Sequence, residues 1–133
     1  MKQVNWGIIG LGNIAIHIAN ALKFTTNSRL LGIASKDQSK IAKFKIEFNL
    51  DDSYCFNNYE NLINCNEIDA IYIALPNSLH CELIKNCIDR NKKILVEKPV
   101  TINLLELENI KKEYDTKNIF FAEGFMYRHH PQI

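Results

Sequence analysis

The stretch Val4-Asn-Trp-Gly-Ile-Ile-Gly10-Leu-Gly12-Asn-Ile-Ala15 decides how this chain folds. Residues 4–9 form a short apolar run that ends at a glycine, which is typical of a strand buried on both faces of a parallel sheet. From residue 14 onward the apolar residues follow helical spacing. The helix face that we expect to be buried consists of Ile14, Ile18, Ala21 and Leu22. A strand, a glycine turn and a helix in this order predict the start of a βαβ unit.

The alternation of strand and helix patterns continues along the whole chain. Further strands are expected at residues 29–34, 53–56, 70–74, 93–96 and 119–122. The helices expected between them are one that Asp37 caps and that buries Ile41, Phe44 and Phe48, one at 59–63, one that buries Leu79, Leu83 and Cys87, and one that Thr101 caps and that buries Leu107, Ile110 and Tyr114. This order predicts an α/β fold with a doubly wound parallel sheet and right-handed connections.

The composition limits the classes of function. The 133 residues are 47% hydrophobic, which is enough for one globular core. The 16 Lys and Arg nearly balance the 15 Asp and Glu, so the overall charge gives no argument for binding nucleic acid or an anionic membrane. No run approaches the roughly 20 apolar residues of a membrane span. The four cysteines lack the spacing of a metal or disulfide framework, so we interpret them as buried thiols of a cytoplasmic protein.

The glycine turn is the first candidate site. In Gly10-x-Gly12-x-x-Ala15, the first glycine permits a tight turn, the second lets a pyrophosphate approach the backbone, and the alanine lets helix and strand pack closely. The free N–H groups at the start of the helix then supply local positive character for phosphates. Taken alone, the same glycines could also mark a sharp turn that binds nothing.

The end of the second strand bears on the choice of cofactor. Ser35 and Lys36 stand where an acidic residue would favour NAD, so NADP is favoured, with the lysine offering a charge and the serine a hydroxyl to the 2′-phosphate. Alternatively, Lys36 is an ordinary solvated lysine. Asp37 is better explained as the cap of the following helix.

Two more segments should meet at the carboxyl edge of the sheet, where ligands of open α/β sheets bind. These are Leu75-Pro-Asn-Ser-Leu-His80 after the fourth strand and Glu97-Lys98-Pro99 after the fifth. At that edge Lys98 could hydrogen-bond a substrate hydroxyl as hydride leaves carbon, or it could simply form an ion pair with Glu97. His80 could carry a proton or act as a hydrogen-bonded positioning group.

The end of the chain reads Glu123-Gly-Phe-Met-Tyr-Arg128-His129-His130-Pro-Gln132. Two adjacent histidines cannot share one face of a helix or strand, so we expect no metal site there. Arg128 is better suited to meet a phosphate, an amide or a carboxylate.

The order of these four motifs resembles the N-terminal NAD(P)-binding domain of the Gfo/Idh/MocA oxidoreductases, and the resemblance runs from Val4 to Gln132. It implies a Rossmann-like dinucleotide-binding domain and hydride transfer between nicotinamide and a sugar-like or polyol secondary alcohol, with the chain's end most similar to the sugar and dihydrodiol dehydrogenase branch. Lys98 is then the catalytic lysine. The cofactor-binding residues implied by the resemblance are Gly10, Gly12, Asn13, Ile14, Ser35, Lys36, Leu75, Pro76, Asn77, His80, Glu97, Lys98 and Arg128.

The resemblance also implies a second, α/β substrate domain and a homo-oligomer in the full-length form. We expect residues 1–122 to be the cofactor domain and residues 123–133 to start the connection to a substrate domain that is absent. The chain alone should then bind cofactor but turn over poorly or not at all. Two alternatives stay open: a non-catalytic dinucleotide-binding or redox-sensing module, and a truncated, inactive gene product that self-associates.

Overall fold

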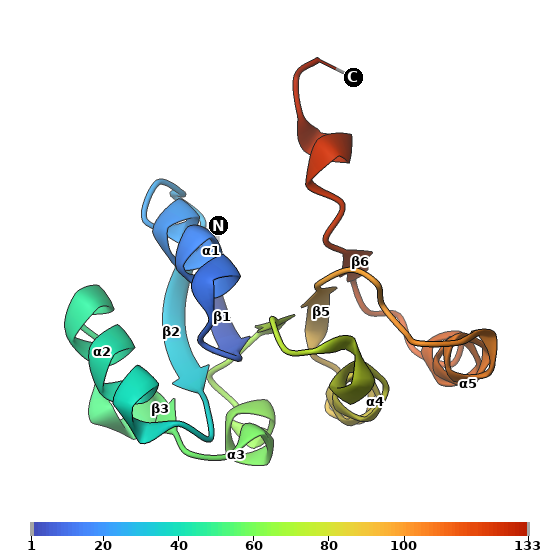
Figure 1. Ribbon diagram of the computed structural model, residues 1–133, viewed down its shortest axis with the longest axis horizontal. Helices are drawn as coiled ribbons and strands as arrows, with labels where there is room; N and C mark the ends of the chain where they lie inside the picture. Colours follow the sequence, from blue (N-terminus) through green and yellow to red (C-terminus); the bar gives the residue numbers. More distant parts are fainter. Residues whose placement is uncertain (1, 133) are drawn as a thin grey trace.

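Six parallel strands form one sheet in the order β3-β2-β1-β4-β5-β6, in a computed structural model that describes residues 2–132 (Figure 1). The strands are β1 (Val4–Ile9), β2 (Ser28–Ala34), β3 (Cys55–Phe56), β4 (Ala70–Ile73), β5 (Lys93–Val96) and β6 (Phe121–Glu123). The chain first builds outward from β1 to β3 and then returns to add β4 on the other side of β1. The strand order therefore reverses between β1 and β4, which is the switch point where ligands of such sheets bind.

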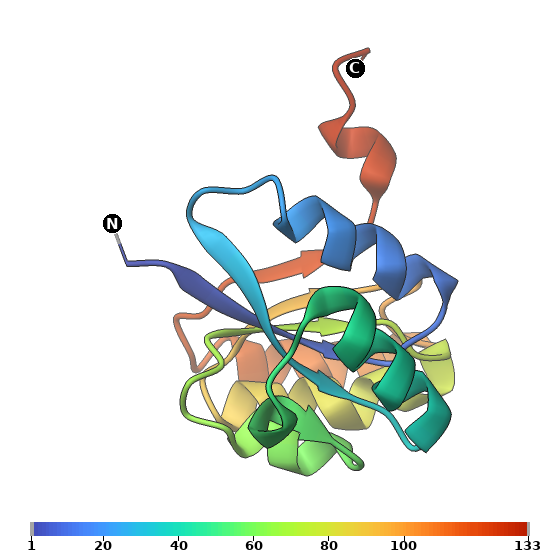
Figure 2. The same cartoon turned by 90° about the vertical axis from the view of Figure 1, so that its left-hand side faces the viewer.

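Helices cover both faces of the sheet, which confirms the doubly wound architecture. They are α1 (Asn13–Leu22), α2 (Gln38–Phe48), α3 (Tyr59–Asn64), α4 (His80–Asp89) and α5 (Leu104–Tyr114), with short 3-10 turns η1 (Asp52–Tyr54), η2 (Asn77–Leu79) and η3 (Met126–His129). Helices α1 and α2 lie on one face and α3, α4 and α5 on the other (Figures 1 and 2). Within residues 2–132, no helix is long and apolar enough to cross a membrane.

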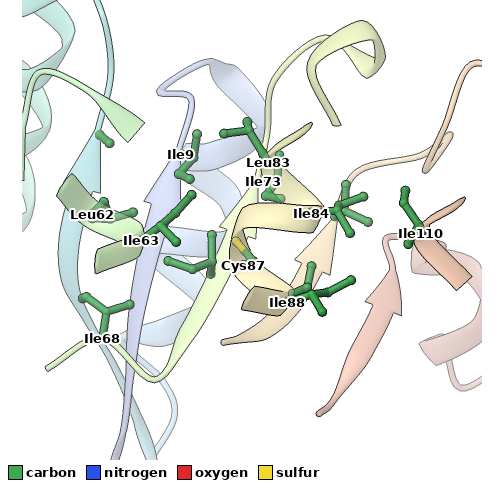
Figure 3. Close-up of a cluster of buried hydrophobic side chains, with 14 residues drawn as sticks. Ile9, Leu62, Ile63, Ile68, Ile73, Leu83, Ile84, Cys87, Ile88 and Ile110 are labelled. Carbon is green, nitrogen blue, oxygen red and sulfur yellow. The ribbon is translucent and has the colours of Figure 1, made fainter. Parts of the chain in front are cut away.

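Two apolar clusters fill the space between the sheet and its helices. The larger one, shown in Figure 3, joins β4 and β5 to α3, α4 and α5. Ile71 and Ile73 of β4 belong to it, whereas Tyr72 between them points to the α1 face and belongs to the second cluster. All four residues of β4 are buried, because a central parallel strand is covered on both faces. Each fully buried isoleucine stabilises the fold by about 1.5–3 kcal/mol.

Several sequence predictions needed correction at helix ends. Thr101 does not cap α5: the Asn103 side chain accepts from the Glu106 N–H at 2.9 Å, while the Thr101 hydroxyl donates to the Asn103 carbonyl oxygen. Leu107 is 41% exposed, so Ile110 is the buried residue of that helix. Leu79 is 40% exposed, because it lies in η2 and α4 begins one residue later.

The other corrections concern strands and the first helix. Residues 53–56 form only a two-residue strand, because Asp51 accepts from the Ser53 N–H and folds the preceding residues into η1. Strand β6 starts two residues later than expected and ends at Glu123. In α1 the buried residues are Ala15 and Ala19, and Ala21 is exposed. Small side chains at these two positions allow the helix to pack closely on the sheet. Of the four cysteines, only Cys87 is buried, and the other three are half-buried free thiols.

Candidate functional site

The ends of three central strands bring three distant segments into one row. Ile9 of β1 pairs with Ile73 of β4, which pairs with Val96 of β5. The residues that follow stay tied across the strands: the Ala74 N–H donates to the Ile9 carbonyl at 2.8 Å, and the Glu97 N–H donates to the Ile73 carbonyl at 3.0 Å. The glycine turn, the segment after β4 and the segment after β5 therefore share the carboxyl edge of the sheet, as predicted.

The two glycines of the turn differ in their surroundings. Gly10 has a φ of +90°, and a Cβ there would lie 2.6 Å from the Ala74 carbonyl oxygen. Only glycine adopts this conformation at low cost, and only glycine fits so close to β4. A Cβ on Gly12, in contrast, would meet nothing within 4 Å. The first glycine is thus required by the fold, whereas the second opens onto free space.

The N-terminus of α1 begins at this free space. Gly12 is its N-cap, no side chain among residues 2–132 caps its first turn, and no acidic residue lies in that turn. Helix α2 differs, because the Asp37 side chain occupies its N-terminus. The Ala15 N–H donates to the Gly12 carbonyl oxygen at 3.2 Å, whereas the Asn13 and Ile14 N–H groups have no partner among residues 2–132. Together with the helix dipole these two groups fit an anion such as a phosphate. The open space at Gly12 and the uncapped helix fit the pyrophosphate of a dinucleotide.

Ser35 and Lys36 follow β2 at the same edge. The Ser35 side chain is buried, and its Oγ accepts from the Asp37 N–H at 3.1 Å, which leaves its own proton free to be donated. Asp37 accepts from the Ser39 N–H at 2.9 Å, so the predicted cap is confirmed. The Ser39 hydroxyl also donates to this carboxylate and lowers the pKa of Asp37. The Asp37 carboxylate is therefore engaged in capping α2.

Lys36 carries a free positive charge beside this strand end. Its side chain is exposed, and its Nζ lies 5.5 Å from the ring centroid of Tyr59. Lys36 forms no ion pair with any of the residues that the structure describes. An unpaired lysine next to a serine hydroxyl is suited to a phosphate monoester.

His80 ties two loops of the site together. It is 1% exposed, and its ring nitrogens lie 2.8 Å from the Leu75 carbonyl oxygen and 3.0 Å from the Pro99 carbonyl oxygen. Because carbonyl oxygens only accept, a neutral ring can satisfy one of these contacts at a time and an imidazolium can satisfy both. Both nitrogens face the protein, so the structure favours the positioning role over proton transfer to a ligand.

In the segment after β5, the side chains of Glu97 and Lys98 do not pair with each other. Lys98 is exposed, its peptide bond to Pro99 is cis, and among residues 2–132 its side chain makes no ion pair. The alternative of a Lys98–Glu97 ion pair is therefore wrong. Glu97 instead accepts a hydrogen bond from the hydroxyl of Tyr72, a residue that was not predicted to belong to the site. Burial, followed by the bond to Glu97, raises the pKa of Tyr72 above its ordinary range.

Glu123 also was not predicted to belong to the site, although it lies in a quoted motif. Its Oε1 accepts from the Val100 N–H at 2.8 Å, which ties the end of β6 to the chain just beyond Pro99. Beside it, a hollow of about 190 Å³ lies between α1 and the C-terminal segment. Residues lining this α1 hollow include Ile14, Ile18, Tyr72, Glu97, Phe125 and Met126.

The remaining predicted residues are less tightly held. Leu75 and Asn77 are half-buried and Pro76 is exposed in the turn that leads into α4. Asn13 is exposed and Ile14 half-buried in the first turn of α1. Arg128 is exposed on η3, in the segment that rises from the sheet edge in Figure 2. Its side chain makes no hydrogen bond or ion pair with residues 2–132.

Comparison with known proteins agrees with this geometry. The D-xylose 1-dehydrogenase (NADP(+)) 2 of Haloferax volcanii is 29% identical over 95% of this chain, and the trans-1,2-dihydrobenzene-1,2-diol dehydrogenase of Xenopus tropicalis is 28% identical over 95%. In both cases the match covers 38% of the relative. The chain thus spans well under half the length of these curated relatives.

Solved structures show the same fold. The 3-ketoreductase KijD10 from Actinomadura kijaniata, crystallised with NADP and TDP-benzene, superposes with a TM-score of 0.90 at 28% identity, covering 98% of this chain and 40% of that protein. The scyllo-inositol dehydrogenase of Lactobacillus casei, crystallised with NAD(H) and scyllo-inositol, also reaches 0.90, but at 24% identity it supports the fold alone.

The model of one protein family covers nearly all of the described chain. It is that of the Gfo/Idh/MocA oxidoreductases with an NAD-binding Rossmann fold, and it matches residues 4–125. The match includes the glycine turn, both segments at the switch point and β6, which are the parts that assemble the site. This chain belongs to the Gfo/Idh/MocA oxidoreductase family, in the part that forms its NAD-binding Rossmann fold.

Proposed function

We propose that this chain binds NADP in preference to NAD and is the cofactor-binding part of an oxidoreductase acting on a sugar-like or polyol secondary alcohol. The observation that carries the proposal is the pair of glycines. Gly10 is required by the fold, but Gly12 leaves open space in front of an uncapped helix N-terminus, where a phosphate is stabilised. The relatives named for D-xylose and dihydrodiol substrates support the substrate class.

Residues along the sheet edge are proposed to contact different parts of the cofactor. Asn13 and Ile14 present backbone N–H groups to the pyrophosphate, and Ser35 and Lys36 hold a 2′-phosphate through a hydroxyl and a charge. Leu75, Pro76 and Asn77 line the middle of the cofactor, and His80 holds their loop against the Pro99 loop. Arg128 is proposed to meet the cofactor from the C-terminal segment.

Lys98 is the proposed catalytic residue. When bound, the nicotinamide ring accepts or gives the hydride. The Lys98 ammonium is exposed and has no carboxylate partner among the described residues, so it is free to hydrogen-bond the substrate oxygen and stabilise the negative charge that develops there. A lysine neutralised by Glu97 would do this less well.

Cofactor titrations test the proposal directly. The purified chain should quench or shift NADPH fluorescence saturably, with weaker binding of NADH. It should oxidise a panel of sugars poorly or not at all, since most of the length of its relatives lies outside the match. Absence of saturable binding of either dinucleotide would refute the proposal. Rapid sugar oxidation that Lys98→Ala abolishes would refute the expected inactivity of the isolated chain.

A further inference from the structure

Tyr72 is an unusual residue for the centre of this sheet. It is fully buried in β4, between two isoleucines that face the other side of the sheet. Its ring packs in the apolar cluster under α1, as a phenylalanine could, but its hydroxyl reaches the α1 hollow and donates to Glu97. Burying a hydroxyl is costly unless it finds a partner, so the pair with Glu97 is what makes a tyrosine acceptable here.

The Glu97 carboxylate is fixed on one side and free on the other. Oε1 accepts from Tyr72, and a Cβ placed on Gly124 would lie 3.3 Å from that same oxygen. Glu97 is half-buried, and within residues 2–132 its second oxygen, Oε2, has no hydrogen-bond partner. The backbone of Glu97 remains in the β4–β5 ladder. The Glu97 carboxylate is therefore held in a defined place through Oε1, and its Oε2 is left open to a ligand.

We propose that Tyr72 is a positioning residue that fixes Glu97 so that its free carboxylate oxygen accepts from the carboxamide of the nicotinamide. This inference rests on the proposed dinucleotide-binding function and deepens it. An amide N–H2 is a donor that a carboxylate binds well. A side chain held in place before the ligand arrives also avoids the entropy lost when a long side chain is ordered on binding.

The decisive comparison uses two ligands, NADPH and 2′-phospho-ADP-ribose, which lacks the nicotinamide. Tyr72→Phe should weaken NADPH binding about three- to tenfold, which corresponds to ordering one long side chain on binding. It should leave the affinity for 2′-phospho-ADP-ribose unchanged. Tyr114→Phe is the matched control, because this tyrosine lies on α5 against Phe121, away from the sheet edge, and should change neither affinity.

Coupling to Glu97 separates positioning from general damage to the fold. In a Glu97→Ala background, Tyr72→Phe should cause no further loss of NADPH affinity, because the residue through which it acts is gone. Gly124→Ala is a second variant that leaves Tyr72 intact. Its methyl group would crowd Glu97 Oε1, so this variant should also weaken the binding of NADPH and leave the binding of 2′-phospho-ADP-ribose unchanged.

Each outcome decides the matter. The positioning role would be overturned if Tyr72→Phe and Gly124→Ala lost affinity for NADPH and for 2′-phospho-ADP-ribose to the same extent, or if NADPH binding stayed unchanged. It would also be overturned if Tyr72→Phe lowered the NADPH affinity by the same factor in the Glu97→Ala background as in wild type. If Tyr72→Phe does not fold, Gly124→Ala carries the same test alone. A wild-type chain that binds neither ligand would refute the proposed function itself, which is a different result from a wild-type chain that binds both while the variants show no selective loss.

Discussion

Substituting alanine for each of the two glycines of the first turn should have opposite consequences. At Gly10 an L-residue in the left-handed region costs about 1–2 kcal/mol. The new Cβ would also lie 2.6 Å from the Ala74 carbonyl oxygen, which the β1–β4 ladder holds in place. Relieving such overpacking costs about 1–3 kcal/mol more. Gly10→Ala should therefore lower the free energy of unfolding by about 2–5 kcal/mol.

Gly12→Ala should leave the free energy of unfolding within about 0.5 kcal/mol of wild type, because its Cβ meets nothing within 4 Å and the backbone is extended. It should nevertheless weaken dinucleotide binding about tenfold or more, because the methyl group takes the space that a phosphate needs against the backbone.

Urea unfolding and cofactor titration measure the two effects separately. Trp6 is the only tryptophan and lies in β1, so its fluorescence reports on the sheet itself. With a urea dependence of about 2 kcal/mol per molar, Gly10→Ala should move the unfolding midpoint down by about 1–2.5 M. Equal losses of stability in the two variants, or NADPH binding by Gly12→Ala as tight as in wild type, would refute the different roles of the two glycines.

Three further predictions concern the edge of the sheet. Lys36→Ala should weaken the affinity for NADPH about tenfold and leave the affinity for NADH unchanged, because the lysine is proposed to contact only the 2′-phosphate. Lys40→Ala on α2 is the control. An equal loss of affinity for both cofactors in Lys36→Ala titrations would contradict the phosphate role. His80→Leu should lower the free energy of unfolding by about 1–3 kcal/mol, since it removes the ring that contacts the Leu75 and Pro99 carbonyl oxygens and donates to at least one of them; a loss below about 0.5 kcal/mol in urea would contradict the role of His80 in tying these two loops together. Hydrogen bonds from Ser39 lower the pKa of Asp37 in the folded chain, so the stability from this cap is present above the ordinary Asp pKa and is lost as pH falls through the lowered value. The urea midpoints of wild type and Asp37→Ala should therefore differ at neutral pH and converge as the pH falls through the lowered pKa of Asp37, and a gap that stays constant with pH would count against the charged cap.

Periodicity predicted the order of strands and helices well, because apolar spacing is a local property of the chain. The ladder of β1, β4 and β5, and the cap at Asp37, were confirmed within a residue. Predictions failed where two local choices compete, as for Thr101 and Asn103 at the start of α5. Both residue types can cap a helix, and in the structure the Asn103 side chain accepts from the Glu106 N–H.

The doubly wound sheet, the glycine turn and the loops that carry His80 and Lys98 could all be predicted from the sequence, because hydrophobic period, glycine and proline act through near neighbours. Which groups meet could be read only from the folded chain: Glu97 pairs with Tyr72 and not with Lys98, and His80 bridges two loops. Those contacts join residues 25 and 19 positions apart. Their geometry depends on the register of β4 against β5, which no local pattern encodes.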